Sequence, residues 1–386
     1  MLLNKKFSCT TLYEEINKLK VIYILKKGFQ YFPPCLTQVL YLNDLGIDLE
    51  IFHGNNSDYI NFLLDQRNII HHTLKKDRQS KNRIDQVFNF FSISQEIKAV
   101  QKQLPNDCIL WIGNLETAMT MDKKLLSSQR FILNVLELYN EKTIYDRWLK
   151  KMATKATLLI CCEKHRAAIM KSRYSLKNTP IVIPNKPYDL EEIFPSNLPI
   201  DNIMNKLQKK FLIVYQGIVM PDRPLGNIVK ALKKINDSQM AFIVMGRCDD
   251  RNYEKSLKAI YKQVYYLGYI PAPQHLVITK LCHLGIANYD FSSLNNVFCA
   301  PNKIYEYAKF GKPMLASQNI GLTETVGACG AAECIDFTNI DDISGAIMSI
   351  REHYEKYSEA SFNFYSNTDC KKIIEKVLEI ISYKLF

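Results

Sequence analysis

Short apolar runs rich in β-branched residues alternate with longer amphipathic segments along most of this chain. The pattern predicts strands separated by helices, as in βαβ units around a parallel sheet that is covered on both faces. We expect strands at residues 20–25, 49–52, 87–93, 108–112, 131–135 and 157–161, and then at 210–217, 240–246, 264–268, 284–287 and 313–316. A helix should begin at Pro33, because a proline lacks only an N–H that the first turn leaves unpaired.

The alternation is interrupted between residues 178 and 200, where five prolines crowd together. Prolines at this density disfavour helix and suit an extended linker. The chain has 386 residues, and roughly 150 residues per domain favours two domains. We therefore expect an N-terminal domain at residues 1–184 and a C-terminal domain at 185–368. An amphipathic helix at 369–386 should follow and can cross back to the N-terminal domain.

Positive charge is concentrated in the first half of the chain. Residues 1–185 contain 27 Lys and Arg against 17 Asp and Glu, whereas residues 186–386 contain 23 against 22. A basic half suits an anionic partner such as a phospholipid surface, a lipid-linked pyrophosphate or nucleic acid, although a solvated lysine-rich surface gives the same count. Nucleic acid is disfavoured, because the basic half lacks basic motifs interleaved with aromatic residues.

Membrane spans and disulfides are not expected. No apolar run reaches roughly 18 residues, and residues 1–20 lack the apolar core of a signal peptide, so we expect a cytoplasmic protein. The 11 cysteines include no C-x-x-C pair, which favours buried free thiols in a reducing compartment. Cys329 and Cys334 are expected to stand alone in a loop.

The most informative segment is residues 295–317, NNVFCAPNKIYEYAKFGKPMLAS. Pro301 and Asn302 predict the start of a helix. The N-terminus of a helix presents unpaired N–H groups that favour a phosphate, and Lys303 adds a mobile cation beside it. Glu306 shares a helix face with Lys303 and could accept hydrogen bonds from a sugar diol. These groups suit a pyrophosphate joined to a ribose, and an ordinary ion pair between Lys303 and Glu306 is the alternative.

The motif P-N-K-x-x-E-Y-x-x-x-G-K-P resembles the donor-site helix of nucleotide-sugar glycosyltransferases of the GT-B type. It is similar in particular to the large retaining family, glycosyltransferase group 1 or family 4-like, of bacterial polysaccharide synthesis. Other segments resemble the family in the expected order: Ile183 to Pro187, Tyr215 to Gly217, Phe242 to Gly246, Leu267 to Pro271 and Leu284 to Tyr289. The resemblance covers residues 155–350 and implies an α/β GT-B fold, in which two Rossmann-like domains face each other across a cleft.

The resemblance also implies a set of donor-binding residues. They are Gly217, Arg223, Gly246, Tyr269, Ile270, Tyr289, Asn296, Pro301, Asn302, Lys303 and Glu306. Two positions depart from the family. The first glutamate of an E-x7-E pair falls on Phe298, with Glu306 as the second. The arginine of an Arg and Lys pair falls on Ile218, and Arg223 takes the place of the lysine.

The N-terminal domain is expected to bind the acceptor, because strand ends face the interdomain crevice in such folds. The candidate acceptor-binding residues are Gly28, Phe29, Gln30 and Asn114. Glu137 follows the strand at 131–135 and could orient or deprotonate an acceptor hydroxyl, with a surface glutamate as the alternative. Lys303 and Arg223 would act as catalytic cations that stabilise the leaving diphosphate.

No metal site is expected. The sequence offers no convincing D-x-D motif, and the adjacent pair Asp249-Asp250 lies in an expected loop. The pair His71-His72 has no identifiable third ligand and is expected in a polar loop, while His53 could face the crevice. Metal independence follows from these absences and from the cations that the resemblance supplies.

Together these features predict a glycosyltransferase without a cofactor that transfers sugar from a UDP- or GDP-sugar. The acceptor would be a glycan, a glycolipid or a protein-linked glycan in bacterial surface polysaccharide or glycoconjugate assembly. The enzyme would act in the cytoplasm or peripherally at the inner face of the cell membrane, with its basic half toward the anionic surface. Retention of configuration is implied by the resemblance alone. A non-catalytic GT-B partner that binds sugar or peptide and stabilises an active enzyme is one alternative, and a nucleotide-sugar epimerase is another.

Overall fold

The computed structural model describes residues 19–76, 83–190, 201–220 and 225–385. The chain divides into two compact units. The first unit comprises Met1–Tyr188 together with Asp369–Phe386, and the second comprises Asp189–Thr368. Among the described residues, no helix has both the length and the apolar character that crossing a membrane requires.

The first unit is built on a seven-stranded parallel sheet. In spatial order its strands are β3 (Ile70–Thr73), β2 (Asp48–His53), β1 (Lys20–Leu25), β4 (Ile109–Ile112), β5 (Phe131–Val135), β6 (Leu158–Cys161) and β7 (Ile181–Val182). The central strands read as continuous apolar runs because helices cover both faces of a parallel sheet. Trp111 and Tyr23 are fully buried on adjacent strands and stack with ring centroids 6.1 Å apart.

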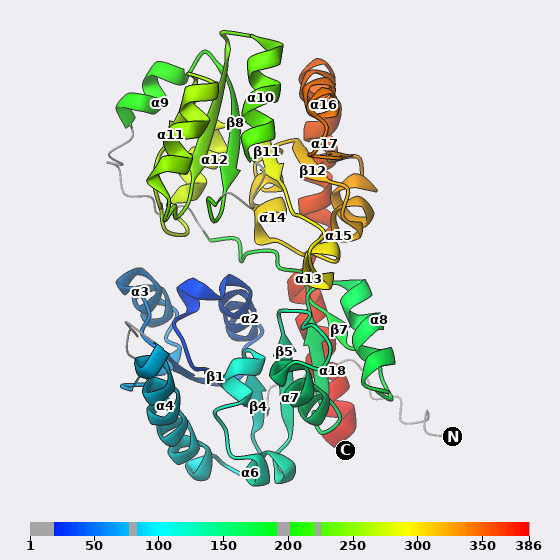
Figure 1. Ribbon diagram of the computed structural model, residues 1–386. Coiled ribbons are helices and arrows are strands. Elements are labelled where there is room, and N and C mark those ends of the chain that lie inside the picture. Colours follow the sequence, from blue (N-terminus) through cyan, green and yellow to red (C-terminus); the bar gives the residue numbers. More distant parts are fainter. Residues whose placement is uncertain (1–18, 77–82, 191–200, 221–224, 386) are drawn as a thin grey trace. The chain divides into compact units, whose positions relative to one another are not determined.

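Eight α-helices and a short 3-10 turn accompany this sheet in the described residues. They are η1 (Phe29–Tyr31), α2 (Pro33–Asp44), α3 (Asp58–Gln66), α4 (Arg83–Gln103), α5 (Leu115–Ala118), α6 (Lys123–Ser128), α7 (Ile144–Ala153), α8 (Lys164–Arg173) and α18 (Cys370–Leu385). The final helix α18 returns to the first unit and contacts α2 (Figure 1). The Cys370 thiol at its start lies 3.5 Å from the carbonyl oxygen of Pro184.

The second unit is built on a six-stranded parallel sheet. In spatial order its strands are β10 (Val264–Tyr266), β9 (Met240–Met245), β8 (Phe211–Gln216), β11 (Leu284–Ala287), β12 (Met314–Ser317) and β13 (Ala332–Ile335). Its helices are α9 (Asp201–Leu207), α10 (Leu225–Ile235), α11 (Arg251–Ile260), α12 (His275–Leu281), α13 (Leu294–Val297), α14 (Asn302–Ala308), α15 (Ile320–Leu322), the π-turn η2 (Thr323–Gly327), α16 (Ile340–Glu352) and α17 (Tyr354–Asn367).

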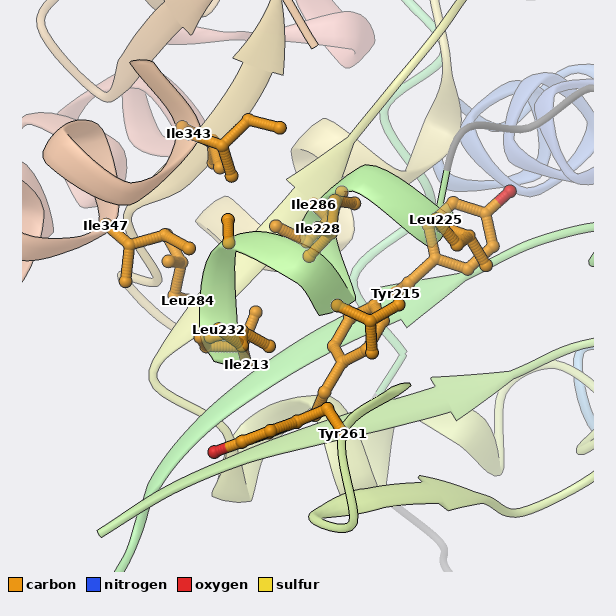
Figure 2. Close-up of a cluster of buried hydrophobic side chains, with 14 of the residues drawn as sticks. Ile213, Tyr215, Leu225, Ile228, Leu232, Tyr261, Leu284, Ile286, Ile343 and Ile347 are labelled. Carbon is orange, nitrogen blue, oxygen red and sulfur yellow. The ribbon is translucent and has the colours of Figure 1, made fainter. Parts of the chain in front are cut away.

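Each face of this second sheet has its own apolar core. On one face, α10 packs against α16 and both cover β8 and β11, as Figure 2 shows for Ile228, Leu232 and Ile347. The opposite face packs against α12, α14 and α17. Consecutive residues of one strand therefore point into different cores: Ile213 lies in the first core and Val214 in the second.

The prediction of a strand at residues 87–93 is wrong, because this segment lies inside the 21-residue helix α4. The helix buries Ile93, Ile97 and Gln101, which recur every four residues on one face. The aromatic residues before them raise the strand propensity locally, but tertiary packing of the helix overrides it.

Two expected loops are strands. His71 and His72 lie in β3, which pairs with β2 at the edge of the first sheet. Cys334 lies in β13 and pairs with β12, whereas Cys329 is an exposed thiol in the turn before it. Both strands are four residues long, so their periodicity gives little signal. The segment 75–83, KKDRQSKNR, is so rich in charged and amide side chains that its sequence predicts an exposed loop, and residues 77–82 of it lie outside the described residues.

Candidate functional site

Two glycines end neighbouring strands of the second unit and touch each other. Gly217 follows β8 with φ +142°, and Gly246 follows β9 with φ +146°. The N–H of Gly217 donates to the carbonyl oxygen of Met245 at 3.0 Å. A Cβ atom placed on Gly246 would lie 1.7 Å from the Gly217 carbonyl oxygen. Both positions therefore need glycine, and the two backbones approach as closely as they do because side chains are absent.

The side chain of Lys303 reaches this glycine junction from α14. Its ammonium lies 4.5 Å from the ring centroid of Tyr215 and 5.3 Å from that of Tyr289, so two aromatic faces stabilise the cation. A Cβ atom on Gly217 would come within 3.1 Å of the Lys303 Nζ. Lys303 itself is 9% exposed. The structure thus holds one nearly buried positive charge directly beside the bare backbone that ends β8.

Glu306 lies one turn further along α14 in a second polar cluster. The Gln216 amide donates to its carboxylate, and the His275 Nε2 lies 3.4 Å from the Glu306 Oε2. The Thr279 hydroxyl donates to the Gln216 Oε1 at 2.8 Å, which turns the amide nitrogen toward Glu306. The carboxylate is therefore oriented by the Gln216 amide, and it has capacity for further hydrogen bonds from a ligand.

Tyr307 fixes α14 against the sheet. Its hydroxyl donates to the carbonyl oxygen of Ile286 at 3.2 Å, and burial raises its pKa well above the usual value. The ring fills the space over Gly285, where a Cβ atom would lie 2.3 Å from a ring carbon. This packing sets the position of α14, and with it the positions of Lys303 and Glu306.

The segment between β11 and α14 is held by side-chain amides. Asn296 donates to the Asp290 carboxylate at 2.7 Å, and the buried Asn319 donates to the backbone carbonyl oxygens of Asp290 and Asn296. Pro301 caps α14 and Asn302 is its first residue. Asn296 and Asn319 therefore hold the segment that follows Tyr289 and leads to α14.

The other residues predicted to bind the nucleotide sugar lie outside these two polar clusters. Tyr269 is exposed, whereas Ile270 packs against the core that includes α14. Arg223 lies outside the described residues. Phe298, which stands at the family's glutamate position, ends the short helix α13. Ile218 is exposed directly after Gly217, and its carbonyl oxygen accepts a hydrogen bond from Tyr215.

In the first unit, Gly28, Phe29 and Gln30 form a loop packed on the segment after β2. A Cβ atom on Gly28 would lie 2.1 Å from the Asn55 carbonyl oxygen, and the Gln30 amide donates to that oxygen at 2.8 Å. The ring of Phe29 is fully buried. Phe29 therefore anchors this loop in the core. Gly28 is buried as well, so among the three only the half-buried Gln30 retains a surface for a ligand.

Asn114 and Glu137 follow neighbouring strands of the first sheet. The Asn114 Oδ1 caps α5 by accepting from the N–H and the hydroxyl of Thr117, at 2.8 and 2.7 Å. The structure thus gives Asn114 a capping role, and its contact with an acceptor stays a prediction. Glu137 is exposed two residues beyond β5. Its catalytic role also stays a prediction.

A buried histidine locks the loop that contains Phe29. The Phe29 N–H donates to the Asn56 Oδ1, so the Asn56 amide nitrogen faces the His53 Nε2 at 3.3 Å. His53 Nε2 therefore accepts, and its Nδ1 donates to the Gly54 carbonyl oxygen at 2.6 Å. His71 Nδ1 also lies 2.9 Å from His53 Nε2. The contact with the Asn56 amide nitrogen, which can only donate, is satisfied when His53 is neutral.

Protonation of His53 should destabilise the protein in acid. Burial lowers the pKa of His53 to about 4, and the neighbouring imidazoles lower it further. The unfolded chain, with an ordinary pKa of about 6.5, binds more protons between these values, so stability falls as pH falls through this window. We expect a loss of about 2–3 kcal/mol between pH 7 and pH 4.5 that His53→Gln lacks. Urea unfolding of both proteins measures it. Equal pH dependence in the two proteins would contradict the assignment, and above pH 7 the slopes should agree.

Three site residues were missed from the sequence as individual contributors: Gln216, His275 and Thr279. Their partners lie 31 to 90 residues away along the chain, as with Gln216 and Glu306. Only the fold brings them together, and the one local signal is the polar residue Gln216 at the end of an apolar strand.

The described residues contain no cluster of three or more His, Cys, Asp or Glu that could hold a metal. Asp250 accepts from the backbone N–H groups of Asn252 and Tyr253 and thereby caps α11. Asp341 pairs with Lys234 at the surface. These aspartates have structural roles in the described part of the chain.

No protein-family model and no curated protein matches the sequence. Solved structures do match. HepE from Anabaena, in complex with UDP and glucose, superposes with a TM-score of 0.67 at 14% identity, covering 94% of this chain and 99% of HepE. A glycosyltransferase from Rickettsia africae gives 0.67 at 15% identity over 95% and 98%. The chain has the GT-B fold. A putative UDP-N-acetylglucosamine 2-epimerase from Listeria monocytogenes shares the same GT-B architecture, with a TM-score of 0.60 at 10% identity over 92% and 94%.

Proposed function

We propose that this chain is a glycosyltransferase that binds a nucleoside diphosphate sugar on its second unit. The observation that carries the proposal is Lys303, whose ammonium lies between two aromatic rings beside the bare backbone of Gly217. A cation prepared in this way suits a diphosphate, whose oxygens can also approach the glycine N–H groups. Glu306, which the Gln216 amide orients, would accept hydrogen bonds from the ribose diol in this proposal.

Further contacts with the nucleotide sugar are proposed for the chain segments around Lys303 and Glu306. The proposed base-binding residues are Tyr269 and Ile270 on the loop after β10. Arg223 is proposed as a second phosphate cation. The proposed donor is a UDP-sugar rather than a GDP-sugar, because HepE from Anabaena and MnaA from S. aureus have been solved with UDP.

Catalysis then depends on charge that develops on the leaving group. As the bond between sugar and diphosphate breaks, negative charge grows on the phosphate oxygens, and Lys303 stabilises it. The chemistry needs no metal in this proposal. Glu137 on the first unit orients or deprotonates the acceptor hydroxyl, and Gly28, Gln30 and Asn114 contribute to acceptor binding. Retention of configuration belongs to the same proposal.

The proposed acceptor is a glycan, a glycolipid or a protein-linked glycan in bacterial surface polysaccharide or glycoconjugate assembly, reached from the cytoplasmic face of the membrane. The basic composition of residues 1–185 supports an anionic acceptor carrier such as a lipid-linked pyrophosphate.

Two other functions have support of their own. The Listeria structure favours a nucleotide-sugar epimerase, which would need no acceptor. Phe298 and Ile218 stand where the glycosyltransferase family that the chain resembles has a glutamate and an arginine. The loss of these two residues favours a non-catalytic partner that stabilises an active enzyme. Release of UDP from UDP-sugars separates the three. Slow hydrolysis of the UDP-sugar without an acceptor, and faster release of UDP when an acceptor is added, support a transferase. Conversion of the UDP-sugar to an isomer supports an epimerase. Binding of the UDP-sugar without any turnover supports the non-catalytic partner.

The proposed role of Glu306 predicts discrimination between ribose and deoxyribose. The wild-type protein should bind UDP roughly tenfold or more tightly than 2′-deoxy-UDP, because one hydrogen bond to a charged group contributes about 1.5–3 kcal/mol. Glu306→Gln should bring the dissociation constants of UDP and 2′-deoxy-UDP closer together. The control Glu355→Gln, on the exposed face of α17, should leave the ratio of the two dissociation constants unchanged. Titration calorimetry with both nucleotides measures the ratios. An unchanged ratio in Glu306→Gln would remove Glu306 from the ribose site.

A further inference from the structure

Helix α4 carries apolar side chains on its outer face as well as on its inner face. Ile84, Val87, Phe88 and Phe91 are 55–70% exposed. Their spacing of three, four and seven residues places them on one side of the helix, opposite the buried Ile93 and Ile97. We call these four exposed residues the α4 stripe. Soluble chains rarely expose a contiguous apolar strip with two phenylalanines unless it contacts something.

The segment before the stripe is strongly basic. Residues 75–83 read KKDRQSKNR and contain five Lys and Arg against one Asp. Its first two residues, Lys75 and Lys76, have exposed side chains. Their backbone N–H groups donate to the two carboxylate oxygens of Glu96 on α4, each at 2.9 Å. The start of the basic segment is therefore tied to the same helix that carries the α4 stripe.

We propose that the α4 stripe docks onto an anionic lipid membrane. A helix with an exposed aromatic and aliphatic face lies in the boundary between headgroups and acyl chains, and neighbouring lysines and arginines are attracted to anionic headgroups. A second copy of the chain fits this surface less well, because a two-fold interface on this part of α4 would bring the exposed Lys75 and Lys76 of both copies close together. The proposal goes beyond the proposed function by naming the surface that contacts the membrane, and it makes no use of the donor site.

Vesicle sedimentation of the full chain tests the proposal. The wild-type protein should bind vesicles of about three parts phosphatidylcholine to one part phosphatidylglycerol, and roughly tenfold less to phosphatidylcholine alone. Raising the salt from about 0.1 M to about 1 M should weaken binding, because it screens the attraction. The double variant Phe88→Ser with Phe91→Ser should bind the anionic vesicles roughly tenfold less, and Lys75→Gln with Lys76→Gln should lose part of the dependence on phosphatidylglycerol.

A matched control removes exposed apolar side chains elsewhere. Met348 on α16 and Phe362 on α17 are 44% and 55% exposed, and replacing both with serine should leave vesicle binding unchanged. Melting temperature checks that every variant folds, and UDP titration separates this test from that of the donor site. The proposal is overturned if the wild-type protein ignores anionic vesicles or if the stripe variant binds them as the wild type does. It is also overturned if the stripe variant converts an oligomer to a monomer, because the stripe would then face a second copy.

Discussion

Gly246→Ala is expected to destabilise the second unit by about 3–5 kcal/mol, through backbone strain and overpacking together. The residue has φ +146°, a conformation that side chains rarely adopt. Its new Cβ atom would also lie 1.7 Å from the carbonyl oxygen of Gly217. Because that atom belongs to the backbone, no rotamer change can relieve the clash. The end of β8 must move, and the space beside Lys303 moves with it.

Urea unfolding of Gly246→Ala measures this effect. The matched control is Gly226→Ala on α10, where a Cβ atom meets nothing within 4 Å. Alanine has a higher helix propensity than glycine, so the control should be neutral or stabilise by up to about 1 kcal/mol. If the two variants are equally stable, the close contact between the glycine strand ends does not exist as described.

Lys303→Met is expected to weaken UDP binding roughly 30- to 150-fold, the equivalent of about 2–3 kcal/mol for a charge-assisted contact. Methionine keeps the length and apolar contacts of the side chain but removes the ammonium between Tyr215 and Tyr289. The loss should therefore appear in ligand affinity. The melting temperature should fall only slightly, because a cation–π contact contributes about 0.5–2 kcal/mol.

The control for this variant is Lys309→Met at the other end of α14. Lys309 pairs with Asp189 at 2.9 Å, away from the glycine junction. The same change of charge on the same helix should leave UDP affinity within about twofold, because the Lys309 ammonium pairs with Asp189 at the opposite end of α14 from Lys303. Equal losses in both variants would indicate a general effect of charge, and Lys303 would then have no specific role in binding.

Much of the fold is readable from the sequence because parallel strands are buried on both faces. The runs at β1, β8, β9 and β11 are apolar apart from Lys20 at the start of β1 and Gln216 at the end of β8, and the structure has strands there. The segment 87–93 misleads because aromatic residues on the exposed side of α4 mix with those that face the core. Short edge strands such as β3 are not predicted from the sequence, because a pair of adjacent histidines shows no alternation of apolar and polar residues.

The site is readable only where its residues share one segment. Lys303 and Glu306 come from one helix with a recognisable start and end, so their spacing alone predicts a common face. Gln216 and His275 meet Glu306 through the fold, from strands and helices far apart in the sequence. Phe29 shows the opposite failure. It follows a strand as a ligand-binding residue would, yet its ring fills the space beside His53 in the core.

The central claim is that the second unit binds a nucleoside diphosphate at Lys303. Titration calorimetry of the wild-type protein with UDP, GDP, CDP and dTDP tests it most directly. We expect one UDP site per chain, with a dissociation constant that Lys303→Met raises and Lys309→Met leaves unchanged. If the folded wild-type protein binds none of the four nucleotides, or if Lys303→Met binds UDP as tightly as the wild type does, the donor site proposed at α14 is contradicted.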